Sequence, residues 1–311
     1  MSDIFDRLKV EQKTSEWLEL RQHGLGGSDM SSIMGLNHYA TPLDVWLEKT
    51  GRKTHEDISG KWAVAKGNVL ETPLRRRFRT LHPELSVQEA HAILRSKAHP
   101  VLQASVDGIL HRKGETGISS YGILEIKTAN SRREHEWKTE DGEYMIPDYY
   151  LAQVTHYMAV TGYTWGYVYA DLGGSEPVEI KFTRDEDDIT SVITAAEDFW
   201  GYVQRDEMPQ LTGEDVVKVY PQDDASLQPT EDTRFENLAR TYKEYTTTER
   251  LAKTEKDRVG NELKTLIGEH KGLISTQYKA TYTTTTYKER FTPARTNRVL
   301  RVNEIKTKET K

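Results

Sequence analysis

A carboxylate and an ammonium group lie two residues apart in a segment that is otherwise typical of a buried strand. Residues 122–130 read GILEIKTAN, with Glu125 and Lys127 among apolar neighbours. Because successive side chains of a strand point to opposite faces, Glu125 and Lys127 share one face and the apolar residues take the other. An ion pair on a solvated face would explain this pair, and so would a reaction centre that needs both charges.

A second acidic residue, Asp107, precedes Gly108 in SVDGIL, and this dipeptide alone is typical of a hairpin turn. If the two segments pair as a hairpin, Asp107 and Glu125 converge on one point. Two adjacent carboxylates repel unless a divalent cation lies between them, and oxygen-rich sites that retain water suit Mg²⁺ or Mn²⁺. Lys127 would then hold or help to deprotonate a metal-bound water.

The surrounding sequence predicts alternating helices and strands. Thr41 as N-cap, Pro42 at the first helical position and Gly51 past the end mark one helix. Ser28 is expected to cap a short helix that ends at Gly35. Further helices are expected over residues 15–22, 60–80 (with a kink or boundary at Pro73), 148–162 and 185–205, and strands over 85–94, 101–112, 121–130, 164–174 and 177–184. This order predicts one α/β or α+β domain.

Composition limits the class of protein without indicating a function. The chain has 311 residues, no cysteine and a formal net charge of -6. Disulfides, thiolate nucleophiles and cysteine-based zinc sites are therefore excluded. No apolar stretch approaches the ~20 residues of a membrane span, and the N-terminus lacks the features of a secretory signal, so a cytoplasmic protein without membrane association is expected. For a phage-encoded or prophage-encoded protein this means the host cytoplasm.

The C-terminal part differs in charge and pattern from the rest. Residues 1–210 are assigned to the main domain, 211–231 to a polar, turn-rich linker and 232–311 to a C-terminal extension. Residues 231–311 hold 18 Lys and Arg against 12 Asp and Glu. The extension is expected to contain a long helix or helical hairpin, a β segment and a basic tail. Apolar residues follow a heptad rhythm interrupted by Glu249 and Lys256: Phe235, Leu238, Tyr242, Tyr245, Ala252, Val259, Leu263 and Leu266.

Aromatic residues in the β segment and the tail lie among lysines and arginines, a composition that could stack on single-stranded DNA. They are Tyr278, Tyr282, Tyr287 and Phe291. An ordinary edge hairpin explains them equally well.

The spacing D-x17-E-x-K, from Asp107 to Lys127, resembles the PD-(D/E)xK nuclease signature, with Val106 in place of the proline. The segment LRQHGLGGSDMSSIMGLNHYATPLDVWLEKTG resembles the opening of the YqaJ viral recombinase family, to which phage lambda exonuclease is related. GNVLE, SVDGIL, LEIKTA and QVTHYMAVTG match its later blocks in order, over roughly residues 15–205. The resemblance implies a restriction-endonuclease-like core, in which helices flank a mixed central sheet.

The resemblance also implies roles for individual residues. Glu71, Asp107 and Glu125 would be the acidic active-site residues, the backbone carbonyl of Ile126 a further metal ligand, and Lys127 the catalytic lysine. From the sequence alone, Glu71 is better explained as an exposed helix glutamate.

A 5′-phosphate would be held by Arg21, Ser28, Ser105 and Gln153. A helix N-terminus at Ser28 favours an anion, and Arg21 offers bidentate phosphate binding. Alternatively, Arg21 is an ordinary surface residue, Ser28 only caps its helix, and Gln153 is a core amide whose hydrogen bonds are satisfied. Tyr157, one turn after Gln153, is equally well explained by packing and by a place in the site.

The expected activity is that of a Mg²⁺-dependent 5′→3′ double-stranded DNA exonuclease, with Mn²⁺ able to substitute. It would degrade one strand from a 5′-phosphorylated end and leave 3′ single-stranded overhangs for annealing. Relatives of the lambda type imply a ring-shaped homotrimer and a single-strand annealing protein as partner. The alternatives are a PD-(D/E)xK endonuclease, a non-catalytic DNA-end or recombination scaffold, and a coiled-coil interaction module over residues 232–270.

Overall fold

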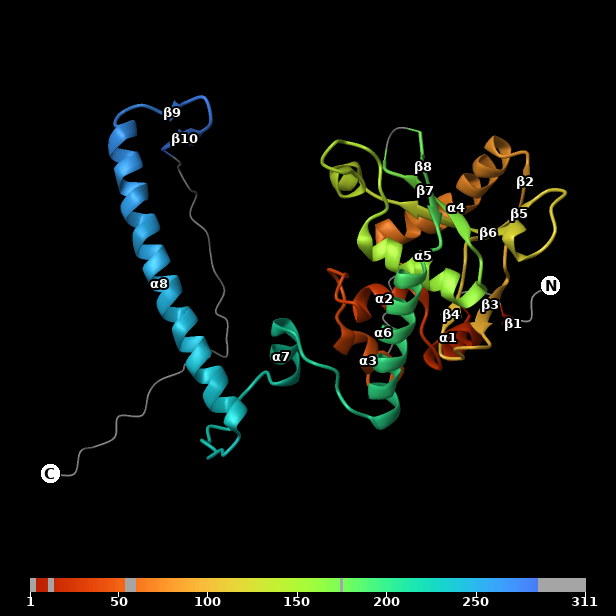
Figure 1. The fold of residues 1–311 in the computed structure, drawn as a ribbon, viewed down its shortest axis with the longest axis horizontal. Helices are drawn as coiled ribbons and strands as arrows, with labels where there is room; N and C mark the ends of the chain where they lie inside the picture. Colours follow the sequence, from red (N-terminus) through yellow and green to blue (C-terminus); the bar gives the residue numbers. More distant parts are fainter. Residues whose placement is uncertain (1–3, 11–13, 54–59, 174–175, 285–311) are drawn as a thin grey trace. The chain divides into compact units, whose positions relative to one another are not determined.

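The computed structural model describes residues 4–10, 14–53, 60–173 and 176–284 (Figure 1). The chain forms two compact units, Met1–Val216 and Val217–Lys311. The basic tail predicted at the C-terminus lies outside the described residues, and so do Tyr287 and Phe291.

A five-stranded mixed sheet lies at the centre of the first unit (Figure 1). Its strands follow the order β2-β5-β6-β7-β8, and all neighbours are antiparallel except β6 and β7. Those two run parallel because a helix connects them. The predicted α/β class with a mixed central sheet is confirmed. The strands are β2 (Leu85–Gln88), β5 (Gly108–Arg112), β6 (Tyr121–Thr128), β7 (Trp165–Asp171) and β8 (Val178–Thr183).

A smaller antiparallel sheet contains a strand that the sequence patterns did not predict. Its order is β1 (Phe5–Lys9), β3 (Ala92–Ser96), β4 (Gln103–Ala104). β1 pairs with β3 along its whole length, from Phe5 opposite Ser96 to Lys9 opposite Ala92. Only its first residue is buried, so the regular alternation of a half-buried strand is missing from the sequence.

Helices cover both faces of the five-stranded sheet. α4 (Trp62–Leu81) packs Leu74 and Phe78 into an apolar cluster with Leu124 and Ile126 of β6. The opposite face of β6 carries Glu125 toward α5, which packs in turn on α2 and α6. Side-chain alternation along β6 therefore separates an apolar layer from a polar one. The helices on the polar side are α2 (Gly27–Ile33), α5 (Asp148–Thr161) and α6 (Glu186–Arg205).

Local signals fix most helix ends in the first unit. Thr41 caps α3 (Pro42–Lys49) through a capping box with Asp44, as predicted. α5 ends at Gly162 in the left-handed conformation, with φ of 69°. α1 (Ser15–Gln22) has the predicted bounds, and two short 3-10 helices cover Ile118–Ser120 and Ser131–Trp137.

Two expectations about helices need correction. Ser28 is not an N-cap: α2 begins at Gly27, Gly26 is the N-cap residue, and Asp29 accepts a hydrogen bond from the Gly26 N–H at 2.9 Å. Of the kink or boundary expected at Pro73, the boundary is absent, because α4 is continuous across this residue. Burial of Leu74 and Phe78 in the core supports the helix across the hydrogen bond that Pro73 cannot donate.

Gly27 allows α2 to approach α5 closely. A Cβ atom at this position would lie 2.6 Å from the ring of Tyr157 and 2.9 Å from the side chain of Gln153. No side chain fits at such distances without displacing a neighbour. The glycine therefore lets the first turn of α2 reach the residues of α5 that face β6.

The second unit consists chiefly of one long helix. α8 (Thr233–Ile267) is followed by a two-stranded antiparallel sheet of β9 (Gly272–Ile274) and β10 (Lys279–Thr281). Of the two forms left open by the heptad pattern, the structure shows a single continuous helix. α7 (Gly213–Val219) lies within the segment assigned to a linker. Among the described residues, no helix combines the length and hydropathy needed to cross a bilayer.

Candidate active site

The pairing of β5 with β6 brings Asp107 and Glu125 together. Gly108 is opposite Leu124 in the antiparallel register, so the residue before β5 lies next to Glu125. Oδ2 of Asp107 accepts a hydrogen bond from the backbone N–H of Ile126 at 2.8 Å. The convergence expected from a hairpin is therefore present, and both carboxylates line one pocket.

Lys127 contacts both β6 and α5. Its Nζ lies 2.6 Å from Oε1 of Glu125 and donates a hydrogen bond to Oε1 of Gln153 at 3.0 Å. The ammonium group also lies 4.5 Å from the ring centroid of Tyr150, within the range of a cation–π interaction. These contacts hold the lysine on the same face as Glu125, as the period of the strand predicts.

The protonation of this cluster depends strongly on its burial. Burial raises the pKa of Asp107 to about 7, and the charge of Glu125 adds to the rise. Burial likewise raises the pKa of Glu125. Burial alone would lower the pKa of Lys127, but the neighbouring Glu125 outweighs it and the pKa is raised. Two carboxylates with raised pKa values beside one ammonium group form a site that favours additional positive charge.

A divalent cation fits the chemistry of this donor set. Oε1 of Glu125 accepts hydrogen bonds from Lys127 and Gln153, whereas Oε2 is buried and has no hydrogen-bond partner. An unsatisfied carboxylate oxygen beside a second carboxylate is what a hard cation such as Mg²⁺ would ligate. Over the described ranges, however, no three Asp, Glu or His side chains gather closely enough to hold one ion among them.

Glu71 lies in the same pocket but is engaged by an arginine. Arg75, one helical turn later on α4, forms ion pairs with Glu71 and with Glu89. Arg75 is buried, and its Nε has no hydrogen-bond partner. The sequence interpretation missed Arg75, although its i,i+4 spacing from Glu71 was a usable signal. Its positive charge also opposes the rise in the pKa of Asp107.

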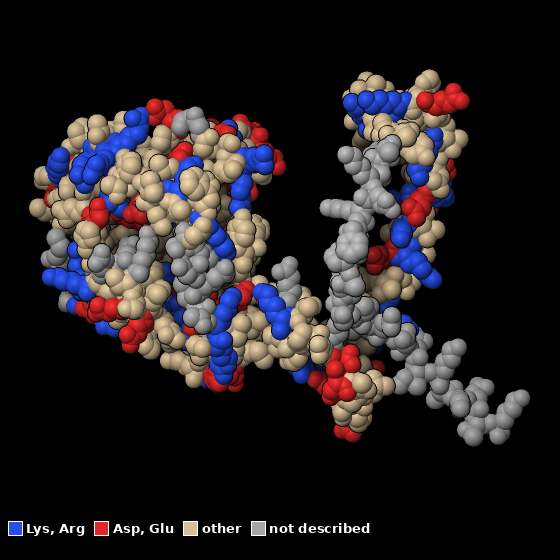
Figure 2. Space-filling view, turned by 180° about the vertical axis from the view of Figure 1, so that it is seen from behind, with Lys and Arg blue, Asp and Glu red and all other residues tan. Residues whose placement is uncertain are grey.

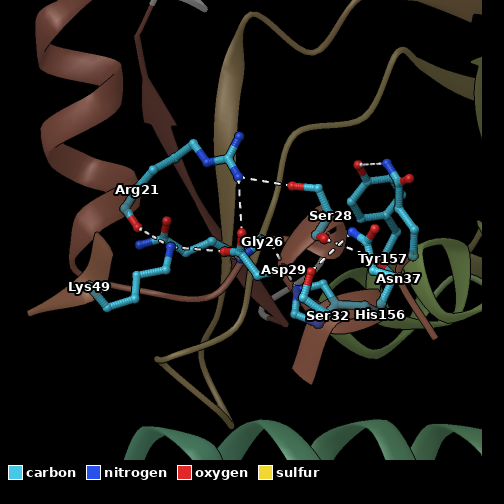
Figure 3. Close-up of polar contacts among 12 residues, drawn as sticks. Arg21, Gly26, Ser28, Asp29, Ser32, Asn37, Lys49, His156 and Tyr157 are labelled. Carbon is cyan, nitrogen blue, oxygen red and sulfur yellow. Dashed lines mark hydrogen bonds and ion pairs between the residues drawn. The ribbon is translucent and has the colours of Figure 1, made fainter. Parts of the chain in front are cut away.

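Arg21 and Ser28 are joined across the N-terminal end of α2 (Figure 3). Nη2 of Arg21 donates a hydrogen bond to Oγ of Ser28 at 2.9 Å and lies 3.5 Å from Oδ1 of Asp29. Lys49 binds Oδ2 of Asp29 at 2.8 Å and donates a hydrogen bond to the Arg21 carbonyl. Burial would raise the pKa of Asp29, but Lys49 and Arg21 outweigh it and hold the pKa at about 2. The carboxylate therefore stays charged and anchors both cations.

The four residues assigned to phosphate binding line the pocket that also holds the three carboxylates. Its volume is about 250 Å³. Ser105 and Asp107 lie two residues apart in the connection between β4 and β5. The shared pocket residues are Arg21, Ser28, Ser105 and Gln153 together with Glu71, Asp107 and Glu125.

Tyr157 contributes to packing and also lines the pocket. Its hydroxyl accepts a hydrogen bond from Nε2 of Gln153 at 2.7 Å. The side chain is buried, and burial raises its pKa well above the ordinary value. Tyr157 therefore remains protonated and helps to fix the amide of Gln153, whose oxygen is then directed at Lys127.

The sequence around this site matches a known domain family. Residues 16–164 match the YqaJ-like viral recombinase domain family. They form a YqaJ-like viral recombinase domain. All the proposed site residues named above, from Arg21 to Gln153, fall inside this YqaJ-like domain.

Two curated proteins are similar to this chain over segments longer than the matched domain. YqaJ of Bacillus subtilis (strain 168) is 32% identical over 213 residues, which are 68% of this chain and 63% of that protein. A protein of Acanthamoeba polyphaga mimivirus is 32% identical over 163 residues, 51% of this chain and 29% of that protein. The chain thus spans less than two thirds of the length of either curated relative.

Two solved structures are similar to part of this chain. The alkaline exonuclease LHK-Exo from Laribacter hongkongensis is 20% identical with a TM-score of 0.47. LHK-Exo in complex with dAMP is 19% identical with a TM-score of 0.48. Each comparison covers 62% of this chain and 94% of the matched chain.

Proposed function

We propose that the protein is a divalent-metal-dependent exonuclease that degrades one strand of duplex DNA from a 5′-phosphorylated end, in the 5′→3′ direction. The observation that supports this most directly is the shared pocket. Asp107 and Glu125 line the same cavity as Arg21 and Ser28, and Lys127 contacts Glu125. The product would carry a 3′ single-stranded overhang suited to annealing.

Asp107, Glu125 and the carbonyl of Ile126 would hold Mg²⁺, with Glu71 contributing when it is released from Arg75. When bound, the ion would supply the Lewis acidity that lowers the pKa of a water and neutralises charge on the scissile phosphate. Lys127, held by Glu125 and Gln153, orients the attacking water and stabilises negative charge in the transition state. Mn²⁺ would substitute, because both ions prefer oxygen ligands.

Arg21 would bind the terminal phosphate and thereby set the direction of digestion. Its guanidinium group already points at Ser28 Oγ (Figure 3). Ser105 and Gln153 line the same cavity. A phosphate between these donors would receive charge-assisted hydrogen bonds. The cleavage site would then lie a short, fixed distance from the 5′ end.

DNA binding would depend on such local groups rather than on net charge. On the face of the molecule shown in Figure 2, Lys and Arg are interspersed with Asp and Glu over the first unit. The chain as a whole is acidic, with a net charge of -6. Phosphate contacts are therefore expected to be few and concentrated near the pocket, which predicts a shallow dependence of affinity on salt.

Linear duplexes with a 5′-phosphate on only one strand test this function. With Mg²⁺, the phosphorylated strand is expected to shorten from its 5′ end while the other strand stays intact. Without Mg²⁺, both strands are expected to persist. Shortening of the hydroxyl-ended strand at an equal rate would overturn the proposed polarity and end selection.

Covalently closed circular duplex separates this function from the two alternatives. An exonuclease needs an end and leaves the circle intact, whereas a PD-(D/E)xK endonuclease cuts it. A scaffold that only binds ends would release nucleotides from neither substrate. A ring-shaped trimer and a single-strand annealing partner, which the lambda-type resemblance implies, belong to this proposal and are tested by sedimentation and by co-purification with the annealing protein.

A further inference from the structure

One face of α8 carries a stripe of mainly apolar residues, called the seam below, and this stripe is exposed along its whole length. Ten positions at alternating spacings of three and four residues form one stripe, beginning at Phe235 and ending at Leu266. Leu238 is 70% exposed and Tyr245 is 72% exposed. Helices in proteins gain most of their stability by packing an apolar face against another element. An exposed apolar stripe of this length therefore needs a partner.

The stripe follows a heptad pattern over five repeats. With Phe235 at position a, the seam consists of apolar and aromatic residues except at two a positions, Glu249 and Lys256. Polar residues at single a positions specify register and orientation at a cost in stability. The a positions are Phe235, Tyr242, Glu249, Lys256 and Leu263, and the d positions are Leu238, Tyr245, Ala252, Val259 and Leu266.

These two charges disfavour a parallel pair of identical helices. In a parallel two-stranded coiled coil, each a residue faces the same residue of the other chain. Glu249 would then face Glu249, and Lys256 would face Lys256, inside the seam. Like charges held at such short range repel, and partial burial strengthens the repulsion.

An antiparallel pair in one register removes the conflict. When the two-fold axis lies midway between Glu249 and Ala252, Phe235 faces Leu266 and Leu238 faces Leu263. Tyr242 then faces Val259 of the second copy.

In the same register, the charged residues find favourable partners. Lys256 meets the ring of Tyr245, a suitable cation–π partner. Glu249 meets the small Ala252 and lies one layer, about 6 Å along the axis, from Lys256 of the second copy.

We propose that α8 is a self-association surface that pairs with α8 of a second copy of this chain as an antiparallel coiled coil. The charge complementarity of Glu249 and Lys256 selects the second copy and its direction. The interface is isologous, because every contact of one residue with another is repeated by the two-fold axis. The pairing is independent of the nuclease chemistry proposed for the first unit. In a ring-shaped trimer it would join α8 of one ring to α8 of a second ring.

Cysteine cross-linking of the full-length chain tests the direction, because the natural chain has no cysteine. Leu238→Cys and Leu263→Cys are made as two separate variants, mixed and oxidised. The antiparallel pair predicts a disulfide-linked dimer in the mixture and none in either variant alone. A dimer from Leu238→Cys alone would indicate a parallel pair, and no dimer in any sample would also overturn the proposal.

A matched control uses the outer face of the same helix. In the proposed pair, Thr247 of one copy is level with Thr254 of the other, just as Leu238 is level with Leu263. Thr247→Cys and Thr254→Cys lie at f positions, however, away from the seam. Their mixture is expected to remain uncross-linked under conditions that link the seam pair. Equal cross-linking of both mixtures would show nonspecific collision and would contradict the proposal.

Charge variants test why the helices pair. Glu249→Lys places four positive charges near the centre of the pair, so the dissociation constant for self-association is expected to rise at least 10-fold. The double variant Glu249→Lys with Lys256→Glu restores opposite charges and is expected to recover most of the affinity. Sedimentation equilibrium of the full chain measures both. An affinity that neither change alters would refute the assigned contacts.

Discussion

The side-chain oxygen of Gln153 accepts a hydrogen bond from Nζ of Lys127 at 3.0 Å. The amide of Gln153 also donates to Oε1 of Glu125 at 2.8 Å and to the hydroxyl of Tyr157. A residue assigned to the phosphate site by resemblance is thus in direct contact with the proposed catalytic pair. α5 therefore couples the two halves of the pocket through one side chain.

Gln153→Ala is expected to slow cleavage of 5′-phosphate and 5′-hydroxyl duplexes by a similar factor, about 10- to 100-fold, because it removes a partner that orients both Glu125 and Lys127. Initial rates on the two substrates measure this effect. Gln204→Ala, a glutamine on α6 outside this pocket, is the control and should cleave normally. A selective loss on the phosphorylated substrate would instead make Gln153 a phosphate ligand alone.

Arg21→Ala is expected to remove the preference for phosphorylated ends while leaving the slower reaction on 5′-hydroxyl ends nearly unchanged. The reason is that the guanidinium group of Arg21 contacts Ser28 and Asp29 rather than the proposed catalytic residues. The ratio of kcat/KM values for the two ends measures this preference. Arg205→Ala, which changes an exposed arginine paired with Glu207, should retain the ratio. A preserved ratio in Arg21→Ala would remove this residue from the phosphate site.

Lys127→Ala is expected to reduce cleavage by at least 100-fold while duplex binding is retained, because the lysine supplies charge stabilisation at the reacting phosphate. Its loss also leaves Glu125 with one partner fewer, so circular dichroism must confirm the fold. Lys181→Ala, on the exposed side of β8, serves as the control. Normal single-turnover cleavage by a folded Lys127→Ala protein would disprove the assigned role.

Mg²⁺ is expected to raise the melting temperature of the natural chain and to leave that of Glu125→Gln unchanged. A ligand that binds only the folded state stabilises it, by about 2.7 kcal/mol at 100 times its dissociation constant. Scanning calorimetry detects this binding without relying on activity. Glu197→Gln changes an exposed glutamate paired with His99 and should keep the full Mg²⁺ response. An equal response in Glu125→Gln would place the ion elsewhere.

His156 is expected to make the protein less stable as the pH falls from 6.5 to 4. Burial lowers its pKa to about 4, and Nε2 bonds the carbonyl of Gln103 at 2.9 Å. The unfolded chain therefore binds the proton first, near pH 6.5, and the native state follows only near pH 4. The resulting loss of unfolding free energy is about 3 kcal/mol over this interval.

Urea unfolding at pH 7 and pH 4.5 measures that loss. His156→Gln should reduce the difference between the two pH values, whereas His23→Gln, at an exposed position, should leave it as in the natural chain. The same pH difference in His156→Gln and the natural chain would show that other groups carry the acid sensitivity.

The sequence by itself determined features that depend on short-range periodicity and local caps. The two-residue period placed Glu125 and Lys127 on one face, and the hairpin interpretation of Asp107 and Gly108 predicted the meeting of two carboxylates. Thr41 and Gly162 marked helix ends because capping uses only neighbouring residues. The proposed site could therefore be assembled largely from local signals and a family resemblance.

Only the tertiary structure decided which partners these residues meet. The hydrogen bond from Lys127 to Gln153 depends on how α5 packs over β6, and the ion pair from Arg75 to Glu71 depends on which side of α4 faces the pocket. β1 is a strand because its backbone pairs with the edge of β3. Such contacts depend on how elements far apart in the chain pack together. A sequence period can suggest a pair, as it does for Glu71 and Arg75, but it does not show which contacts form.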